Sequence, residues 1–209
     1  MKTVECVPNF SEGRNRGKVE QIVEAISSVE TVKILDMELD ENHNRSVVSF
    51  TVGLEHAVEA AFAGIAKAAQ LIDLNKHSGE HPRFGASDVI PFIPLSGATS
   101  DDCIKLAREL GRRVGEELQI PVYMYADAAF LENRKSLENI RTKSFCYDFH
   151  QVPCRESSQF PQKISLQQSA PLYQSLELVR IYLREKSGRV DMERPMVVRK
   201  WQLSYRAGT

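Results

Sequence analysis

The segment "HSGEHPRFG", residues 77–85, places two histidines, a glutamate and an arginine between two apolar stretches. Connecting loops favour Gly, Asn, Asp and Ser because these residues adopt turn conformations easily, and that preference does not account for two imidazoles. An imidazole titrates near neutral pH and can take or give a proton when a neighbouring group orients it. The segment therefore predicts acid–base chemistry, with His81, flanked by Glu80 and Arg83, as the strongest candidate.

The same segment also contains a metal-binding pattern. His77, Glu80 and His81 spell H-x-x-E-H, which on a helix would turn both imidazoles toward a zinc ion. Gly79 lies inside this pattern and Pro82 follows it directly, and a proline disfavours the helical conformation of the residue before it. We therefore expect no metal here. An ordinary surface histidine remains the alternative to the acid–base interpretation.

Two further polar segments have unusual compositions: "VPNFSEG" at 7–13 and "LDMELDENHNRS" at 35–46. Each of them, like the extended segment 77–88, lies at the end of an element that the sequence predicts. Loops at the ends of rigid elements can aim their side chains at a common cleft. The three segments are therefore expected to meet.

Charged residues in these segments suggest roles in binding. Asp36, Glu38 and Asp40 alternate along a predicted strand and so share one face, which either meets a cationic group or is simply solvated. Arg45 and Arg83 can each hold a carboxylate with paired donors, as a glutamate-like ligand needs, although a surface salt bridge explains either residue equally well.

The elements that position these segments follow from apolar periodicity. Pro91 and Pro94 each remove a backbone donor, so their strand is expected at an edge or interrupted, and Ser100 is expected to cap the helix that follows. The order of elements predicts an α+β fold of the ferredoxin-like kind, with a mixed or antiparallel sheet and helices on one face. Strands are expected at 3–10, 31–39, 45–53, 88–95 and 121–128, and helices over 19–26, 55–74 and 100–118.

Composition limits the classes of partner. The chain has 209 residues, 42% of them hydrophobic, and a formal net charge of -1, which gives no general attraction to nucleic acid or to anionic membranes. No apolar run is long enough for a signal peptide or a membrane span, and the four cysteines form no CxxC pair. A cytoplasmic protein with reduced cysteines is expected.

The pattern changes near residue 144. Residues 144–171 are rich in Ser, Gln and Pro without sustained periodicity, which is typical of a linker, and a short helix is expected at 172–186. The predicted organisation is a domain over residues 1–143 followed by a divergent tail over residues 144–209.

Four motifs together are specific to one family. They are "ECVPNFSEGRN", "HNRSVVSFTVG", "AAQLIDLNKHSGEHPRFGASDVIPFIPL" and "RVGEELQIPVYMYADAA". In order and separation they resemble the N-terminal subdomain of the glutamate formimidoyltransferase family. The resemblance implies a ferredoxin-like subdomain and transfer of a formimidoyl group between N-formimino-glutamate and tetrahydrofolate, in histidine degradation.

The resemblance also assigns roles to residues. It implies His81 as the general acid–base, and it places Glu38 where the family usually has aspartate, so that a carboxylate is retained to hold the imidazole or the formamidinium charge. Arg45 and Arg83 fall on family motif positions, and their role as carboxylate clamps is our inference from their chemistry; folate and substrate binding are expected of them and of Asn9 and Asp40. Tetrahydrofolate is then a co-substrate, and no metal is implied.

In the family a second subdomain follows, and folate lies in the groove between the two. The tail after Ser144 does not resemble that subdomain. Two hypotheses follow. The chain is a folate enzyme, self-sufficient or completed by a homo-oligomer or a partner that supplies the missing subdomain; or it is a non-catalytic binding or regulatory module of the same fold.

Overall fold

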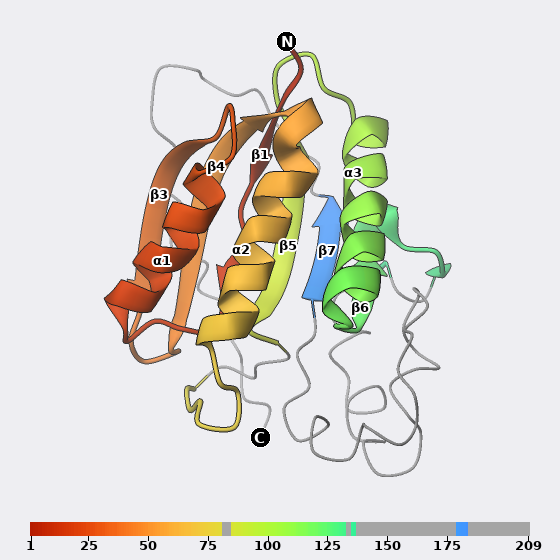
Figure 1. Ribbon diagram of the computed structural model, residues 1–209. Helices are drawn as coiled ribbons and strands as arrows, with labels where there is room; N and C mark the ends of the chain where they lie inside the picture. The colour runs from red at the N-terminus through yellow and green to blue at the C-terminus, as the bar shows by residue number, and fades with distance from the viewer. Residues whose placement is uncertain (81–84, 133–134, 137–178, 184–209) are drawn as a thin grey trace, which may run out of the picture.

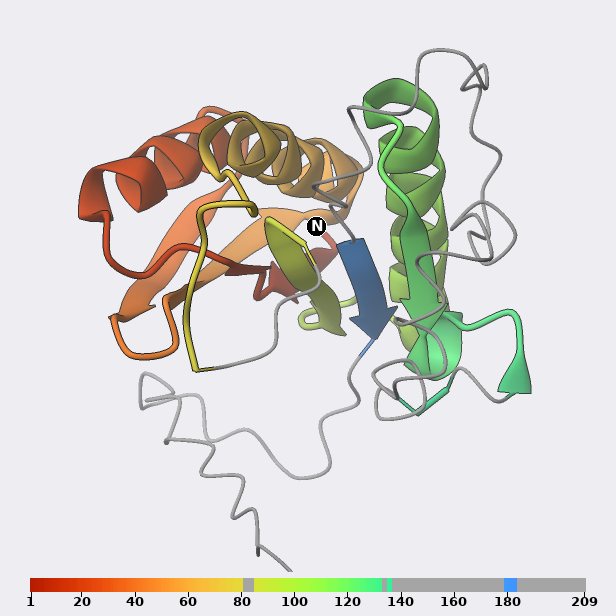
Figure 2. The ribbon, with the colours of Figure 1, turned by 90° about the horizontal axis from the view of Figure 1, so that it is seen from below.

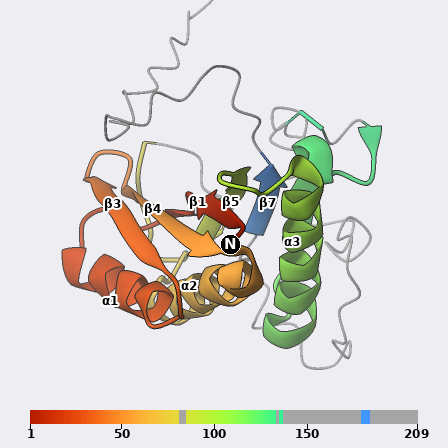
Figure 3. The same cartoon turned by 90° about the horizontal axis from the view of Figure 1, so that it is seen from above.

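The computed structural model describes residues 1–80, 85–132, 135–136 and 179–183. In this part of the chain, three α-helices pack on one face of a mixed sheet (Figures 1 and 3), so the expected α+β class is confirmed. The strands are β1 (Thr3–Cys6), β2 (Asn9–Phe10), β3 (Lys33–Asp40), β4 (Arg45–Gly53), β5 (Ser87–Pro94), β6 (Val122–Tyr125) and β7 (Val179–Leu183). The α-helices are α1 (Arg16–Ser27), α2 (Ala57–Leu71) and α3 (Ser100–Arg113), and the shorter turns are η1 (Leu54–His56), η2 (Val114–Leu118) and η3 (Ala126–Ala128).

Strand β3 lies at one edge of the described sheet and pairs with β4 alone. Next to β4 come β1 and β2, which each pair antiparallel with both β4 and β5 and so act as one interrupted strand. The interruption falls at Val7 and Pro8, since proline has no backbone N–H to donate. Strands β7 and β6 complete the order beyond β5.

Neither alternative expected for the strand containing Pro91, an edge position or an interruption, is correct: β5 runs from Ser87 to Pro94 without a break and is not at an edge. Strand β5 is central, because it pairs with β1 and β2 on one side and with β7 on the other. Pro91 faces the interruption between β1 and β2, where its carbonyl oxygen accepts from the Val7 N–H at 3.2 Å. Pro94 ends the strand. Proline has no backbone N–H, and both prolines therefore lie where β5 is not required to donate a hydrogen bond to a neighbouring strand.

The helix expected at 172–186 is also wrong, since its described part, residues 179–183, is strand β7. This strand runs parallel to both β5 and β6 and joins them into one sheet. Its sequence, "VRIYL", is β-branched and aromatic, a composition that favours strands. The linker expected at 144–171 lies outside the described residues.

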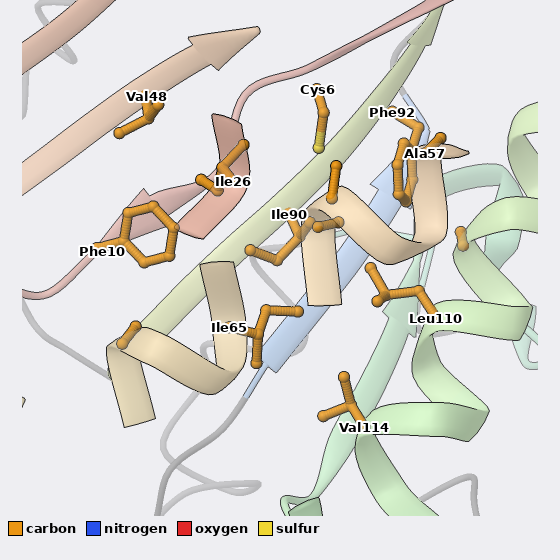
Figure 4. Close-up of a cluster of buried hydrophobic side chains, with 14 of the residues drawn as sticks. Cys6, Phe10, Ile26, Val48, Ala57, Ile65, Ile90, Phe92, Leu110 and Val114 are labelled. Atoms are coloured by element: carbon orange, nitrogen blue, oxygen red, sulfur yellow. The ribbon is translucent and has the colours of Figure 1, made fainter. Parts of the chain in front are cut away.

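The core lies between the sheet and the helices, as Figure 4 shows, and is built from Phe10, Phe50, Phe92 and the aliphatic side chains around them. Helices α1 and α2 come close at Gly64, where a Cβ would lie 2.8 Å from the Ile26 side chain. Cys6 is a buried free thiol, and burial raises its pKa well above the ordinary value.

One helix boundary differs from the expected one by a single residue. Thr99, not Ser100, caps α3: its hydroxyl accepts from the Asp102 N–H, and the Asp102 carboxylate accepts from the Thr99 N–H. A capping box needs an acidic or amide side chain three positions after the cap. Asp102 occupies that position for Thr99, whereas Cys103 occupies it for Ser100. Among the described residues, no helix combines the length and apolar character that a membrane span requires.

Candidate functional site

The face of the sheet opposite the helices carries a polar cluster made by Asn9, Arg45 and Asp88. Arg45 donates from Nε (3.1 Å) and from Nη2 (2.6 Å) to the Asn9 side-chain oxygen, and Nη2 lies 3.8 Å from an Asp88 carboxylate oxygen. Asp88 is only 3% exposed. A buried carboxylate needs a compensating charge or donor, which the arginine supplies. The cluster therefore fixes the position of the Arg45 guanidinium.

A row of carboxylates follows the edge strand on this face. Asp36, Glu38 and Asp40 are all exposed along β3, while the residues between them pack toward the core, as the alternation predicted. Glu38 and Asn9 both lie opposite Val47 in β4, on either side of it. Residues directly opposite one another share a face, so Glu38 and Asn9 are about 10 Å apart, two strand spacings.

Asp40 lies opposite Arg45 in register, but its carboxylate turns toward the β3–β4 turn. It accepts from the His43 N–H at 3.0 Å, and its other oxygen is 2.7 Å from His43 Nδ1. The His43 backbone N–H, together with the imidazole, lowers the pKa of Asp40. Asp40 thus stabilises the turn that leads from Glu38 to Arg45.

The segment after β2 packs against this turn. Any Cβ at Gly13 would overlap the Asp40 carbonyl oxygen and the Arg45 backbone, so only glycine allows the close approach. Glu12 accepts from the backbone N–H groups of Arg14 (3.0 Å) and Asn15 (2.9 Å). Burial by itself raises the pKa of Glu12, but these donors and Lys18 outweigh that effect, and the pKa is lowered.

The segment "HSGEHPRFG" begins beside the same turn, as the view from below in Figure 2 shows. Glu80 donates its N–H to the Asn42 carbonyl oxygen at 3.2 Å, and Arg14 reaches the Glu41 carbonyl (2.9 Å) and the Ser78 hydroxyl (3.4 Å). The three polar segments of the sequence therefore meet at one end of the sheet, as expected.

His77 has a structural contact in this arrangement. Its Nε2 lies 2.9 Å from the Asn44 carbonyl oxygen, so this nitrogen carries the proton and donates it. Residues 77–80 are not helical, as Gly79 and Pro82 predicted. Among the described residues no three His, Cys, Asp or Glu side chains form a metal-binding group. That this chain binds no metal stays a prediction.

The structure places four of the six candidate site residues. Asn9 and Arg45 are in contact, while Glu38 and Asp40 are near them on β3. His81 and Arg83 lie outside the described residues. Four further residues of the site lie within the three predicted polar segments, but the sequence interpretation missed their individual roles: Ser11, Glu12, Asn44 and Asp88.

Only one of the missed residues had a recognisable signal. Asp88 is a single carboxylate at the start of an otherwise apolar strand, and such a residue must be paired when the strand is buried. Ser11 and Asn44 bond segments that are distant in the sequence, whereas Glu12 accepts from the nearby residues Arg14 and Asn15.

The matches to known proteins that are described here all belong to the formiminotransferases. Residues 3–165 match the formiminotransferase domain, N-terminal subdomain. The chain is 60% identical over 148 residues to a glutamate formimidoyltransferase from Thermoplasma acidophilum, covering 71% of this chain and 49% of that protein. It is 45% identical over 142 residues to a formimidoyltransferase-cyclodeaminase from Rattus norvegicus, covering 68% of this chain and 26% of the relative.

A third relative, a glutamate formimidoyltransferase from Streptococcus pyogenes serotype M1, is 40% identical over 144 residues, covering 69% of this chain and 48% of that protein. The match thus spans about half the length of the two glutamate formimidoyltransferases and about a quarter of the bifunctional relative.

Proposed function

Because the chain belongs to the formiminotransferase N-terminal subdomain family, we propose that it acts in formimidoyl transfer between N-formimino-glutamate and tetrahydrofolate. The observation that carries the proposal is the meeting of the three polar segments at one end of the sheet. There residues 77–80, which lead to His81, bond the β3–β4 turn; Glu38 lies on the strand that enters this turn, and Arg45, bonded to Asn9, begins the strand that leaves it. In this role tetrahydrofolate is a co-substrate and no metal takes part.

The reaction needs two proton transfers. A ring nitrogen of tetrahydrofolate forms a bond to the formimino carbon and loses its proton, and the glutamate nitrogen gains a proton as its bond to that carbon breaks. A single group that titrates near neutral pH can accept the first proton and donate the second. In the proposal His81 is that group, within a segment whose preceding residues are held by the β3–β4 turn.

The charges of the candidate residues suit this substrate pair. Glu38 is an exposed carboxylate that can balance an imidazolium or a formamidinium charge, both of which are positive. Arg45 and Arg83 supply positive charge for the carboxylates of the glutamate substrate and of the folate glutamate. Arg45 is already oriented by Asn9, which lowers the entropy lost when a ligand binds.

We infer further that the fold is ferredoxin-like. Strand β1 lies between β4 and β5, and β3 lies outside β4, with all of these pairings antiparallel. That order, with α1 and α2 as the two crossovers, supports the inference. In this interpretation β7 and β6 extend the fold beyond β5.

A second candidate function is a non-catalytic folate-binding or regulatory module. One observation favours it: the match spans about half the length of the two glutamate formimidoyltransferases. If the relatives need their remaining half to enclose folate, this chain requires a partner or a second copy of itself to be active. The proposed location is the cytoplasm, where folate and amino-acid metabolism take place.

The test is a transfer assay on the purified full chain. The chain is incubated with N-formimino-glutamate and tetrahydrofolate, and both products are measured by mass spectrometry. We expect formimino-tetrahydrofolate and glutamate in equal amounts, with the rate proportional to chain concentration. Binding of tetrahydrofolate without transfer supports the module instead. If the chain shows no binding and no transfer, both proposals are contradicted.

A further inference from the structure

Asn44, the last residue of the β3–β4 turn, joins all three polar segments of the site. Its side-chain oxygen accepts from the Gly13 N–H at 2.9 Å, and its side-chain nitrogen donates to the Ser78 carbonyl at 3.1 Å. Its own carbonyl oxygen accepts from His77 Nε2 at 2.9 Å. Asn44 is 7% exposed; its bond to Gly13 is buried, and its bonds to Ser78 and His77 are partly buried.

The backbone at Asn44 explains why the residue is asparagine. Its φ of 48° lies in the left-handed region, which asparagine, aspartate and glycine tolerate better than other residues. Only asparagine among these three offers both an acceptor for Gly13 and a donor for Ser78. Gly79 tightens the same contact, since a Cβ there would overlap the His43 carbonyl group.

A separate contact holds the segment where it enters β5. The Ser11 hydroxyl donates to the Gly85 carbonyl at 2.7 Å, and the Ser11 N–H donates to the Ala86 carbonyl at 2.8 Å. The residues on both sides of 81–84 are therefore bonded to the same framework, by Asn44 before that stretch and by Ser11 after it.

We propose that Asn44 is a positioning residue for formimidoyl transfer, which acts by fixing residues 77–80 against the turn that follows Glu38. This inference rests on the proposed function and deepens it. Asn44 touches no reacting atom. It sets where the segment bearing His81 leaves the turn, and a displacement of about 1 Å in a reacting group can cost on the order of a hundredfold in rate.

Two variants distinguish the contributions of the two hydrogen bonds that the Asn44 side chain makes, to Gly13 and to Ser78. Asn44→Gly keeps the backbone conformation and removes both bonds, whereas Asn44→Asp keeps the acceptor for Gly13 but places an oxygen against the Ser78 carbonyl oxygen. The matched control is Gln119→Gly. Gln119 also has a positive φ, 58°, and its side-chain amide bonds two carbonyl groups, but it ends η2, away from the site.

The experiment measures amide hydrogen exchange at Gly13 and Glu80 by NMR, together with kcat and KM for transfer. In Asn44→Gly we expect faster exchange at both amides and a fall in kcat of about ten- to a hundredfold, with a smaller change in KM. In Asn44→Asp we expect faster exchange at Glu80 while Gly13 stays protected. Gln119→Gly should leave both amides and kcat unchanged.

Hydrogen exchange needs no substrate, so the two levels of the proposal fail separately. Faster exchange at Glu80 in an otherwise folded Asn44→Gly chain, with no transfer by the wild-type chain, supports the anchoring and overturns the proposed function. Transfer by the wild-type chain with unchanged exchange and unchanged kcat in both variants overturns the positioning role. A fall in kcat equal to that of Gln119→Gly also overturns it, because the effect is then one of general stability.

Discussion

Two groups of charged and polar residues in this molecule differ in how far apart their partners lie in the sequence. At the end of α3, Arg112 bonds Glu109 and Glu116 at 2.6 Å each, three and four residues away, with all three side chains nearly half exposed. At the site, Arg45 bonds Asn9 across 36 residues, and Ser11 bonds Gly85 across 74.

This difference in sequence separation indicates which contacts matter for function. Exposed pairs on one helix are easily formed and contribute little to stability, because solvent screens them. Contacts between distant segments hold loops in one arrangement, and such contacts are what a reacting group requires. We therefore expect changes at Arg112 and Glu109 to be silent and changes at the site to be costly, in the order given below.

The largest effect is expected from His81→Ala. Removal of a general acid–base typically lowers the rate by about a hundred- to ten-thousandfold, so turnover should fall by that order. The urea midpoint should stay near that of the wild-type chain, because the role is chemical. If the wild-type chain transfers the formimidoyl group and His81→Ala does so equally well, the catalytic role of His81 is wrong.

The next effect is on stability. Asp88→Ala leaves the Arg45 guanidinium, whose side chain is 22% exposed, without its nearby buried carboxylate. Removing one partner of a buried pair costs about 3 kcal/mol, so the free energy of unfolding measured in urea should fall by roughly that amount. Arg112→Ala is the control from α3 and should leave the urea midpoint unchanged. Equal effects of the two substitutions would remove the distinction between the groups.

Much of this arrangement follows from the sequence. Alternation along β3 predicted the exposed carboxylates, apolar spacing predicted α1 and α2, and the family motifs gave a resemblance that the match over residues 3–165 confirms. These features are local, or they depend on many residues at once.

Other features depend on single tertiary contacts that no local pattern records. The central position of β5 depends on the coincidence of Pro91 with the break at Val7 and Pro8. The roles of Ser11 and Asn44 depend on partners 74 and 31 residues away. Strand β7 has only five residues, and periodicity over so short a stretch does not distinguish a strand from a helix.

A smaller effect is expected on the pH profile. If Glu38 lies near the His81 imidazole, it favours the charged form and raises the pKa of that imidazole. Glu38→Gln removes the anion and lowers this pKa, so the acidic limb of the kcat profile should shift to lower pH, by up to about one unit. Glu109→Gln, which changes a carboxylate on α3, should leave the profile unchanged. A shift to higher pH in Glu38→Gln would contradict the assignment.

The smallest effect concerns acid stability. The pKa of Glu12 is lowered from its usual 4.5, so its ionised form stabilises the fold above about pH 4.5. This contribution is lost as the pH falls through the lower folded-state pKa. In Glu12→Gln the free energy of unfolding should therefore depend less steeply on pH below about 4.5, as measured by urea unfolding at several pH values.

Glu109 provides the comparison from α3. Its pKa is also lowered, by Arg112, but the pair is exposed. Glu109→Gln should leave the pH dependence of stability nearly unchanged, because solvent screens that pair. If the two substitutions flatten the pH dependence equally, burial does not distinguish them.

The most direct test of the account is a calorimetric titration of the full chain with tetrahydrofolate, because transfer to a co-substrate requires that the chain bind it. We predict saturable binding with one site per chain, weakened at least tenfold in Arg45→Ala and unchanged in Arg112→Ala, as expected for loss of a charge-assisted contact. An absence of saturable heat at tetrahydrofolate concentrations up to about 1 mM, or equal binding by the wild-type chain and Arg45→Ala, would contradict it.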